Sequence, residues 1–174
     1  METNAIHQQT STQFEQIISS EALLAHWQGH RKLTRKTIEA FPEDKLFSYS
    51  VGGMRPLSAL ALEIMDISQD GIKGLATGEW KAISELDHTI GKPTFKTKAE
   101  LLQQWDQITE QINLFWPQIS DQRFLEIELA FGAYEGKVID LLLYFIDNEI
   151  HHRAQSYVYL RALGIEPPAF WDRD

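Results

Sequence analysis

The sequence contains no cysteine, has only 10 glycines and 6 prolines in 174 residues, and has no long hydrophobic run. Without cysteine, disulfides, thiolate metal ligands and a cysteine nucleophile are excluded, and this composition suits a reducing compartment. No segment approaches the roughly 20 apolar residues of a membrane-spanning helix. The N-terminal residues are polar and contain no secretory core. We therefore expect a cytoplasmic protein that does not associate with membranes.

Positive charge is also scarce. The formal net charge of -9 opposes binding to a phosphate backbone and argues against nucleic acid as a partner. The single basic stretch, Arg31, Lys32, Arg35 and Lys36, is interpreted as the solvent-exposed face of a helix. Arg153 is expected to form an exposed ion pair, and such pairs contribute little stability.

Apolar residues recur every three or four positions in four segments, which predicts four amphipathic helices. These segments are approximately 20–41, 56–75, 97–119 and 138–163. Thr97 and Glu100 form a capping-box pattern that marks the start of the third helix, and Gly164 suits a left-handed cap after the last. A long connection with one short helix joins the second and third helices. We predict an all-α fold, a four-helix bundle with a long crossover connection between its second and third helices.

Two other parts of the chain do not have helical periodicity. Residues 1–19 are rich in Gln, Ser and Thr and are predicted to be a flexible N-terminal lead-in, which leaves 20–174 as a single domain. Between 121 and 136, apolar and other residues alternate, which indicates one short extended segment.

Polar residues interrupt the buried stripe of the last predicted helix. Stepping by three or four positions from Phe145 leads to Asn148, His152 and Gln155. Burying an amide and an imidazole costs free energy unless each finds a hydrogen bond or a metal. Glu63 interrupts the apolar stripe of the second helix in the same way. We therefore place the candidate site at Glu63, Asn148 and His152.

The three side chains could act together as metal ligands. Asn148 and His152 project from one helical face, and Glu63 would complete a set of three ligands with an open position, as in catalytic metal sites. Two alternatives remain open. The same residues could form a structural hydrogen-bond network that fixes helix register, or the more exposed pair Asp147 and His151, about 100° around the helix, could be the functional one.

The remaining histidines provide weaker signals. His30 lies on the same predicted face as Trp27 and Thr34, where it is either a packed histidine or part of the cavity wall. His7, His26 and His88 show no coherent set of partners in the sequence.

Several motifs together resemble the DinB/YfiT-like family, and the resemblance covers residues 20–171. They are VGGMRP at 51–56, GLATGEW at 74–80, NEIHHRAQ at 148–155 and YLRALGIEPP at 159–168. The resemblance implies a DinB-like four-helix bundle, a homodimer and a link to stress response. It also implies a divalent metal, zinc or nickel, held by one histidine on the second helix and two on the last.

In this chain the implied ligand positions are Glu63, Asn148 and His152, so two of the three histidines are missing. A neutral amide is a poor zinc ligand, and we expect the metal to be weakly held or absent. The resemblance thus leads to two hypotheses. The first is a metal-dependent S-transferase or hydrolase, using an external small thiol on an electrophilic small molecule. The second is a non-catalytic, stress-associated bundle that binds a small apolar ligand or none, with a purely structural polar cluster.

Overall fold

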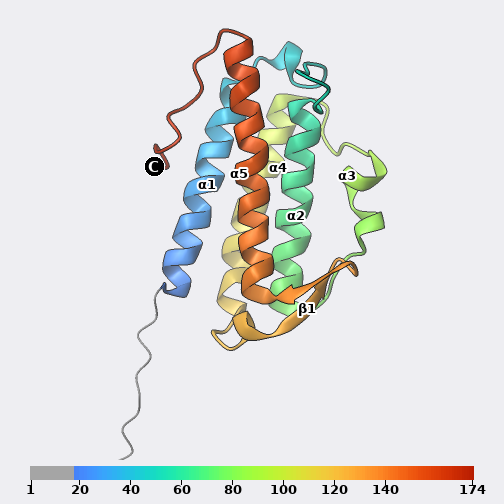
Figure 1. Ribbon diagram of the computed structural model, residues 1–174, viewed down its shortest axis with the longest axis vertical. Helices are drawn as coiled ribbons and strands as arrows, with labels where there is room; N and C mark the ends of the chain where they lie inside the picture. Colours follow the sequence, from blue (N-terminus) through green and yellow to red (C-terminus); the bar gives the residue numbers. More distant parts are fainter. Residues whose placement is uncertain (1–17) are drawn as a thin grey trace, which may run out of the picture.

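The computed structural model describes residues 18–174, and it confirms the predicted four-helix bundle (Figure 1). Its long helices are α1 (Ser20–Ala40), α2 (Leu57–Thr77), α4 (Lys98–Phe115) and α5 (Val138–Ala162). The crossover from α2 to α4 contains the short helix α3 (Asp87–Ile90). Most of the predicted lead-in at 1–19 lies outside the described residues. Across 18–174, none of the helices is long and apolar enough to cross a membrane.

Capping residues set the ends of the helices, within a few residues of the predicted bounds. Ser19 is the N-cap of α1, and its hydroxyl accepts a hydrogen bond from the Ala22 amide at 3.1 Å. The predicted Thr97–Glu100 capping box is present at the start of α4. Helix α4 ends earlier than predicted because Pro117 lacks an amide hydrogen, and the chain continues as a 3₁₀ turn at Trp116–Gln118.

The predicted extended segment is strand β1 (Ile127–Ala130), and it pairs with a second strand that we did not predict, β2 (Tyr134–Lys137). The two strands form an antiparallel hairpin at one end of the bundle (Figure 1). At its turn Phe131 has a φ of 55°, a left-handed conformation that costs a non-glycine residue about 1 kcal/mol. The Phe131 carbonyl accepts a hydrogen bond from the Ile83 amide at 3.0 Å, which ties the crossover to the hairpin.

Helix α5 packs against both α1 and α2, and α4 packs against the same two helices on the other side. The approach of α5 to α2 depends on Gly71, because a Cβ there would lie 2.6 Å from the Phe145 ring. The order around the bundle is therefore α1, α5, α2, α4. Two faces of α5 meet different neighbours, which matters for the polar residues on this helix.

A layer of buried polar side chains separates two hydrophobic core clusters, one near the hairpin and one near the opposite end. We call this layer the sealed network. It consists of His30, Arg31, Thr34, Glu149 and Arg153. Thr34 donates a hydrogen bond to Glu149 Oε1 at 2.6 Å, and Arg31 Nη1 lies 3.6 Å from Glu149 Oε2. Arg153 donates to the His30 carbonyl at 3.3 Å and to Thr34 Oγ1 at 3.2 Å.

Two arginines of the sealed network, Arg31 and Arg153, were predicted to be exposed, and both predictions are wrong. Arg31 is 0% exposed and Arg153 is 6% exposed, so neither belongs to a solvent-exposed face. Arg31 is accommodated because its guanidinium stacks 3.4 Å from the Trp105 ring and also donates to the Trp105 carbonyl. These partners lie on α4, and helical periodicity within α1 carries no information about them.

Candidate functional site

The structure brings together the three residues expected to form the site. Asn148 Nδ2 donates a hydrogen bond to Glu63 Oε1 at 3.1 Å, and His152 Nε2 lies 3.0 Å from the same oxygen. Asn148 and His152 come from consecutive turns of α5, and Glu63 comes from the facing side of α2. The predicted convergence across this interface is therefore present. The role of these residues as metal ligands stays a prediction.

Two further residues complete this group, which we call the Glu63 cluster. Arg55, just before α2, donates from Nη2 to Glu63 Oε2 at 2.6 Å. Gln155 Oε1 lies 2.8 Å from His152 Nδ1. The Glu63 cluster thus contains Arg55, Glu63, Asn148, His152 and Gln155. The sequence placed Gln155 on the same stripe as His152, but it gave no indication of Arg55. The VGGMRP motif contains Arg55, but its pairing depends on how the loop before α2 turns.

Hydrogen bonds keep the Glu63 carboxyl ionised. Burial favours the neutral acid, but donors from His152, Arg55 and Asn148 outweigh it and hold the pKa of Glu63 well below its ordinary value. An ionised carboxylate accepts about four hydrogen bonds in total. The three donors named here fill three of these positions.

Of the two neighbouring histidines, His152 faces the site. It is 5% exposed and contacts Glu63, whereas His151 is exposed. Asp147, the proposed partner of His151, also lies on the exposed face of α5. His30 is a packed histidine, 2% exposed, with its Nδ1 3.0 Å from Arg153 Nη2.

The Glu63 cluster does not fit a zinc or nickel site of the three-histidine type. Its single carboxylate is already paired with the Arg55 cation, and the Asn148 NH₂ group points at the carboxylate. Among residues 18–174, no group of three or more His, Cys, Asp or Glu side chains is placed to hold a metal ion. Within this cluster, Asn148 Oδ1 is buried and has no hydrogen-bond partner in the described part of the chain.

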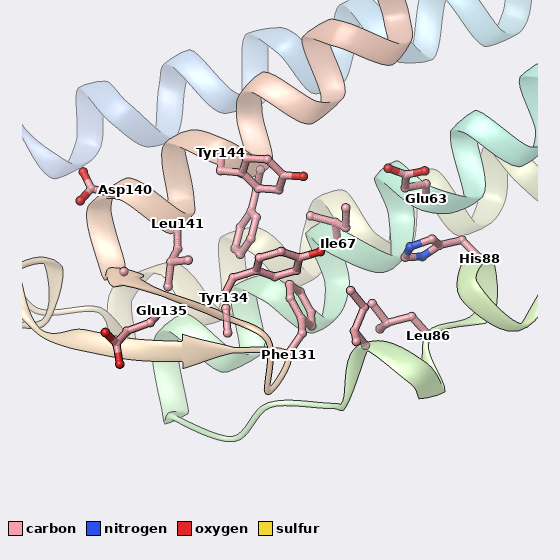
Figure 2. Close-up of a pocket in the computed structure, with 14 residues that line it drawn as sticks. Glu63, Ile67, Leu86, His88, Phe131, Tyr134, Glu135, Asp140, Leu141 and Tyr144 are labelled. Atoms are coloured by element: carbon pink, nitrogen blue, oxygen red, sulfur yellow. The ribbon is translucent and has the colours of Figure 1, made fainter. Parts of the chain in front are cut away.

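Glu63 also lines a pocket of about 310 Å³ between α2, α5, the crossover and the hairpin (Figure 2). We call it the aromatic pocket. Its walls are mainly apolar and aromatic and include Ile67, Leu86, Phe131, Tyr134, Leu141, Tyr144 and Phe145. Figure 2 shows Glu63 and His88 at the end of the pocket away from Asp140. The pocket therefore combines an apolar body with a polar end.

His88 is a site residue that sequence reasoning missed. Its ring Nδ1 lies 2.7 Å from Asp66 Oδ2, a partner that the sequence did not indicate. His26 also has one, since its Nε2 lies 3.3 Å from that of His30, while His7 lies outside the described residues. Asp66 follows Glu63 by three positions and so lies on the same face of α2. This spacing is visible in the sequence and could have indicated Asp66 as a residue near the candidate site. The location of His88 depends on the fold of the crossover.

Comparisons with known proteins agree with this fold. The model of a family described as the DinB family matches residues 7–173. Among curated proteins, none matches the chain. A DinB-like protein from Bacillus cereus has a TM-score of 0.67 at 17% identity, over 87% of this chain and 97% of that one.

Two Bacillus subtilis structures are similar to the same extent. The DinB-like protein YjoA has a TM-score of 0.66 at 17% identity, over 87% of this chain and 99% of its own. YfiT, described as a probable metal-dependent hydrolase with an unusual four-helix bundle topology, has a TM-score of 0.63 at 17% identity. The latter match covers 87% of this chain and 93% of YfiT. At this level of identity, the likeness concerns the fold.

Proposed function

This chain belongs to the DinB family, whose model matches residues 7–173, and we propose that it binds a small, largely apolar molecule in the aromatic pocket. The observation that carries the proposal is the pocket itself, which has apolar and aromatic walls and the ionised Glu63 at one end. Small-molecule sites commonly combine apolar walls with a few polar groups that orient the ligand.

Glu63 is suited to anchor one end of such a ligand. Arg55, Asn148 and His152 hold its carboxylate in place and leave an acceptor position unused. A ligand that carries an O–H or N–H group on an apolar body would satisfy that position. The aromatic rings would contact the rest of the ligand.

Binding can be measured with N-phenyl-1-naphthylamine, a neutral aromatic amine whose fluorescence rises in an apolar site. We expect saturable binding by the wild type. Tyr134→Ala should weaken the affinity about tenfold, which corresponds to about 1.4 kcal/mol of lost contact. Tyr134 is 51% exposed, so the fold should tolerate the substitution.

The matched control is Phe170→Ala, since Phe170 is another exposed aromatic residue, at 63%, but does not line the aromatic pocket. Its affinity for the probe should equal that of the wild type. The absence of saturable binding, or an equal loss in both variants, would overturn the proposal.

A metal-dependent enzyme of this family is the second candidate, and the unpartnered Asn148 Oδ1 favours it. In this reading Glu63, Asn148 and His152 would hold a divalent metal, zinc or nickel, and an external small thiol would be the co-substrate. The metal would have to compete with Arg55 for Glu63. The fold relative YfiT, described as a probable metal-dependent hydrolase, supports it by analogy alone.

The two candidates differ in metal content. Protein purified without a metal-affinity step should contain no stoichiometric metal if the first proposal is correct. Stoichiometric metal that is lost in His152→Ala and retained in His151→Ala would favour the second. Mass spectrometry of the metal content of all three proteins distinguishes these outcomes.

A further inference from the structure

A second carboxylate of α2 holds a histidine at the polar end of the aromatic pocket. Asp66 Oδ2 accepts a hydrogen bond from the His88 backbone amide at 2.6 Å and lies 2.7 Å from His88 Nδ1. The Asp66 and His88 side chains are 10% and 14% exposed. Two contacts to one oxygen hold both the backbone and the ring of His88. Its orientation at the pocket is therefore well defined.

This contact also determines which ring nitrogen is available. An ionised carboxylate only accepts hydrogen bonds, so His88 Nδ1 must carry the proton. In the neutral ring, Nε2 then has the free lone pair. Its contact with Thr89 Oγ1 is 3.4 Å long and is easily replaced. Asp66 would stabilise the imidazolium formed when Nε2 accepts a proton, as the aspartate does in a Ser-His-Asp triad.

Hydrogen-bond donors approach the same end from the opposite wall. Figure 2 shows the hydroxyl groups of Tyr134 and Tyr144 directed toward the end of the pocket that holds Glu63 and His88. Burial, with the nearby Tyr134 and Glu63, raises the pKa of Tyr144, so its phenol stays protonated and can donate. A base and two hydroxyl donors thus face one apolar cavity.

We propose that the aromatic pocket hydrolyses small apolar carboxylic esters without a metal, with His88 as general base and Asp66 as its positioning residue. His88 Nε2 removes a proton from water while the water oxygen bonds to the acyl carbon. Tyr134 and Tyr144 donate hydrogen bonds to the resulting oxyanion. The bond from the acyl carbon to the alkoxy oxygen then breaks, and the proton on Nε2 passes to that oxygen. One water is consumed, and a carboxylic acid and an alcohol are released.

This inference rests on the proposed function, because the ester must first bind in the aromatic pocket. The test substrate is 1-naphthyl acetate, whose ring resembles that of the binding probe. We expect saturable hydrolysis above the uncatalysed rate that is unaffected by EDTA. His88→Gln should lower kcat on the order of 100-fold, which is typical of the loss of a general base.

Three further variants separate catalytic from structural effects. Asp66→Asn retains an oxygen for the His88 backbone amide but loses the charge, so it should lower kcat and leave KM unchanged. The double variant Tyr134→Phe with Tyr144→Phe keeps the rings and should likewise lower kcat, on the order of 100-fold, with KM unchanged. His151→Gln is the matched control, because His151 is exposed on α5 and should hydrolyse the ester at the wild-type rate.

The outcomes distinguish this inference from the proposal on which it rests. If the wild type binds N-phenyl-1-naphthylamine but does not hydrolyse the ester above background, only the hydrolytic inference fails. Equal rates for His88→Gln and His151→Gln, or activity that EDTA abolishes and zinc restores, would also overturn it. If the probe does not bind to the wild type at all, the proposed function fails first.

Discussion

Helix α5 carries two polar clusters that are one residue apart in sequence and very different in surroundings. Glu149 and Arg153 face α1 and belong to the sealed network, whereas Asn148 and His152 face α2 and belong to the Glu63 cluster. Each pair is spaced by four residues, so each lies along one face of the helix. The two faces meet different helices, and only the face toward α2 adjoins the aromatic pocket.

The two clusters differ in how accessible they are. In the sealed network, Arg31 and Glu149 are 0% exposed, so a ligand cannot reach them without opening the bundle. In the Glu63 cluster, the side chains of Arg55 and Glu63 are 48% and 16% exposed. Burying charges as deeply as in the first case costs solvation energy that their pairing must offset. A partly open cluster avoids much of that cost and stays available to a ligand.

The largest expected difference is in stability. Glu149→Ala removes the anion beside Arg31 and leaves that guanidinium buried without its charge partner, so the free energy of unfolding should fall by about 3–5 kcal/mol. Urea unfolding measures this loss. Glu149→Gln should lose less, because its amide oxygen can still accept the hydrogen bond from Thr34. A loss below about 1 kcal/mol in Glu149→Ala would contradict the structural role of the sealed network.

The second expected effect of the sealed network is on the pH dependence of the free energy of unfolding. Burial, together with the charges of Arg153, Arg173 and His26, lowers the pKa of His30 from 6.5 to about 3. The unfolded chain therefore binds a proton on His30 below about pH 6.5, whereas the folded chain binds it only near pH 3. The free energy of unfolding should fall as the pH is lowered through this window, by up to about 1.4 kcal/mol per unit.

Urea unfolding of the wild type and of His30→Gln, from about pH 7.5 to about pH 5, measures that slope. The glutamine oxygen can accept the hydrogen bond that Arg153 donates to His30 Nδ1, so the variant should fold. Its stability should fall less steeply with acid than that of the wild type. Parallel slopes for the two proteins would show that His30 is not the responsible group.

A substitution in the Glu63 cluster should change the stability of the protein less, and the protonation of Glu63 more, than a substitution in the sealed network. His152→Ala removes one of the donors that lower the pKa of Glu63, while the partial burial that raises it remains, so the pKa of Glu63 should rise. The free energy of unfolding should fall by about 1–3 kcal/mol because a buried hydrogen-bond partner is lost. Carboxyl NMR titration and urea unfolding measure the two effects. His151→Ala is the control and should change neither, since His151 is exposed.

The smallest effect is expected at the open side of the Glu63 cluster. Arg55→Gln should lower the free energy of unfolding by less than about 1 kcal/mol, because Arg55 is 48% exposed and such ion pairs contribute little. Thermal unfolding at low and high salt checks this expectation. A loss as large as that in Glu149→Ala would remove the distinction between the two clusters.

The bundle and much of its site could be predicted from local patterns. Helical periodicity correctly predicted that His152 and Asn148 point inward and that Glu63 lies on the facing stripe of α2. The capping box at Thr97 marked the start of α4. These predictions succeeded because side-chain direction repeats about every 3.6 residues and a cap acts within one helical turn. Both effects involve residues close together in the sequence, where a pattern can be recognised.

The sequence alone thus determined the positions of the helices and their inward faces, including the inward direction of Asn148 and His152 on the last helix. The partners were decided by the packing of the helices and of the crossover. Arg31 is buried because α4 and α5 supply its contacts, and His88 reaches the pocket because the crossover places it on Asp66, 22 residues earlier. Periodicity tells which way a side chain points from its own helix. It does not tell which helix or loop lies opposite, and that neighbour decides whether a charge is sealed in the core or available to a ligand.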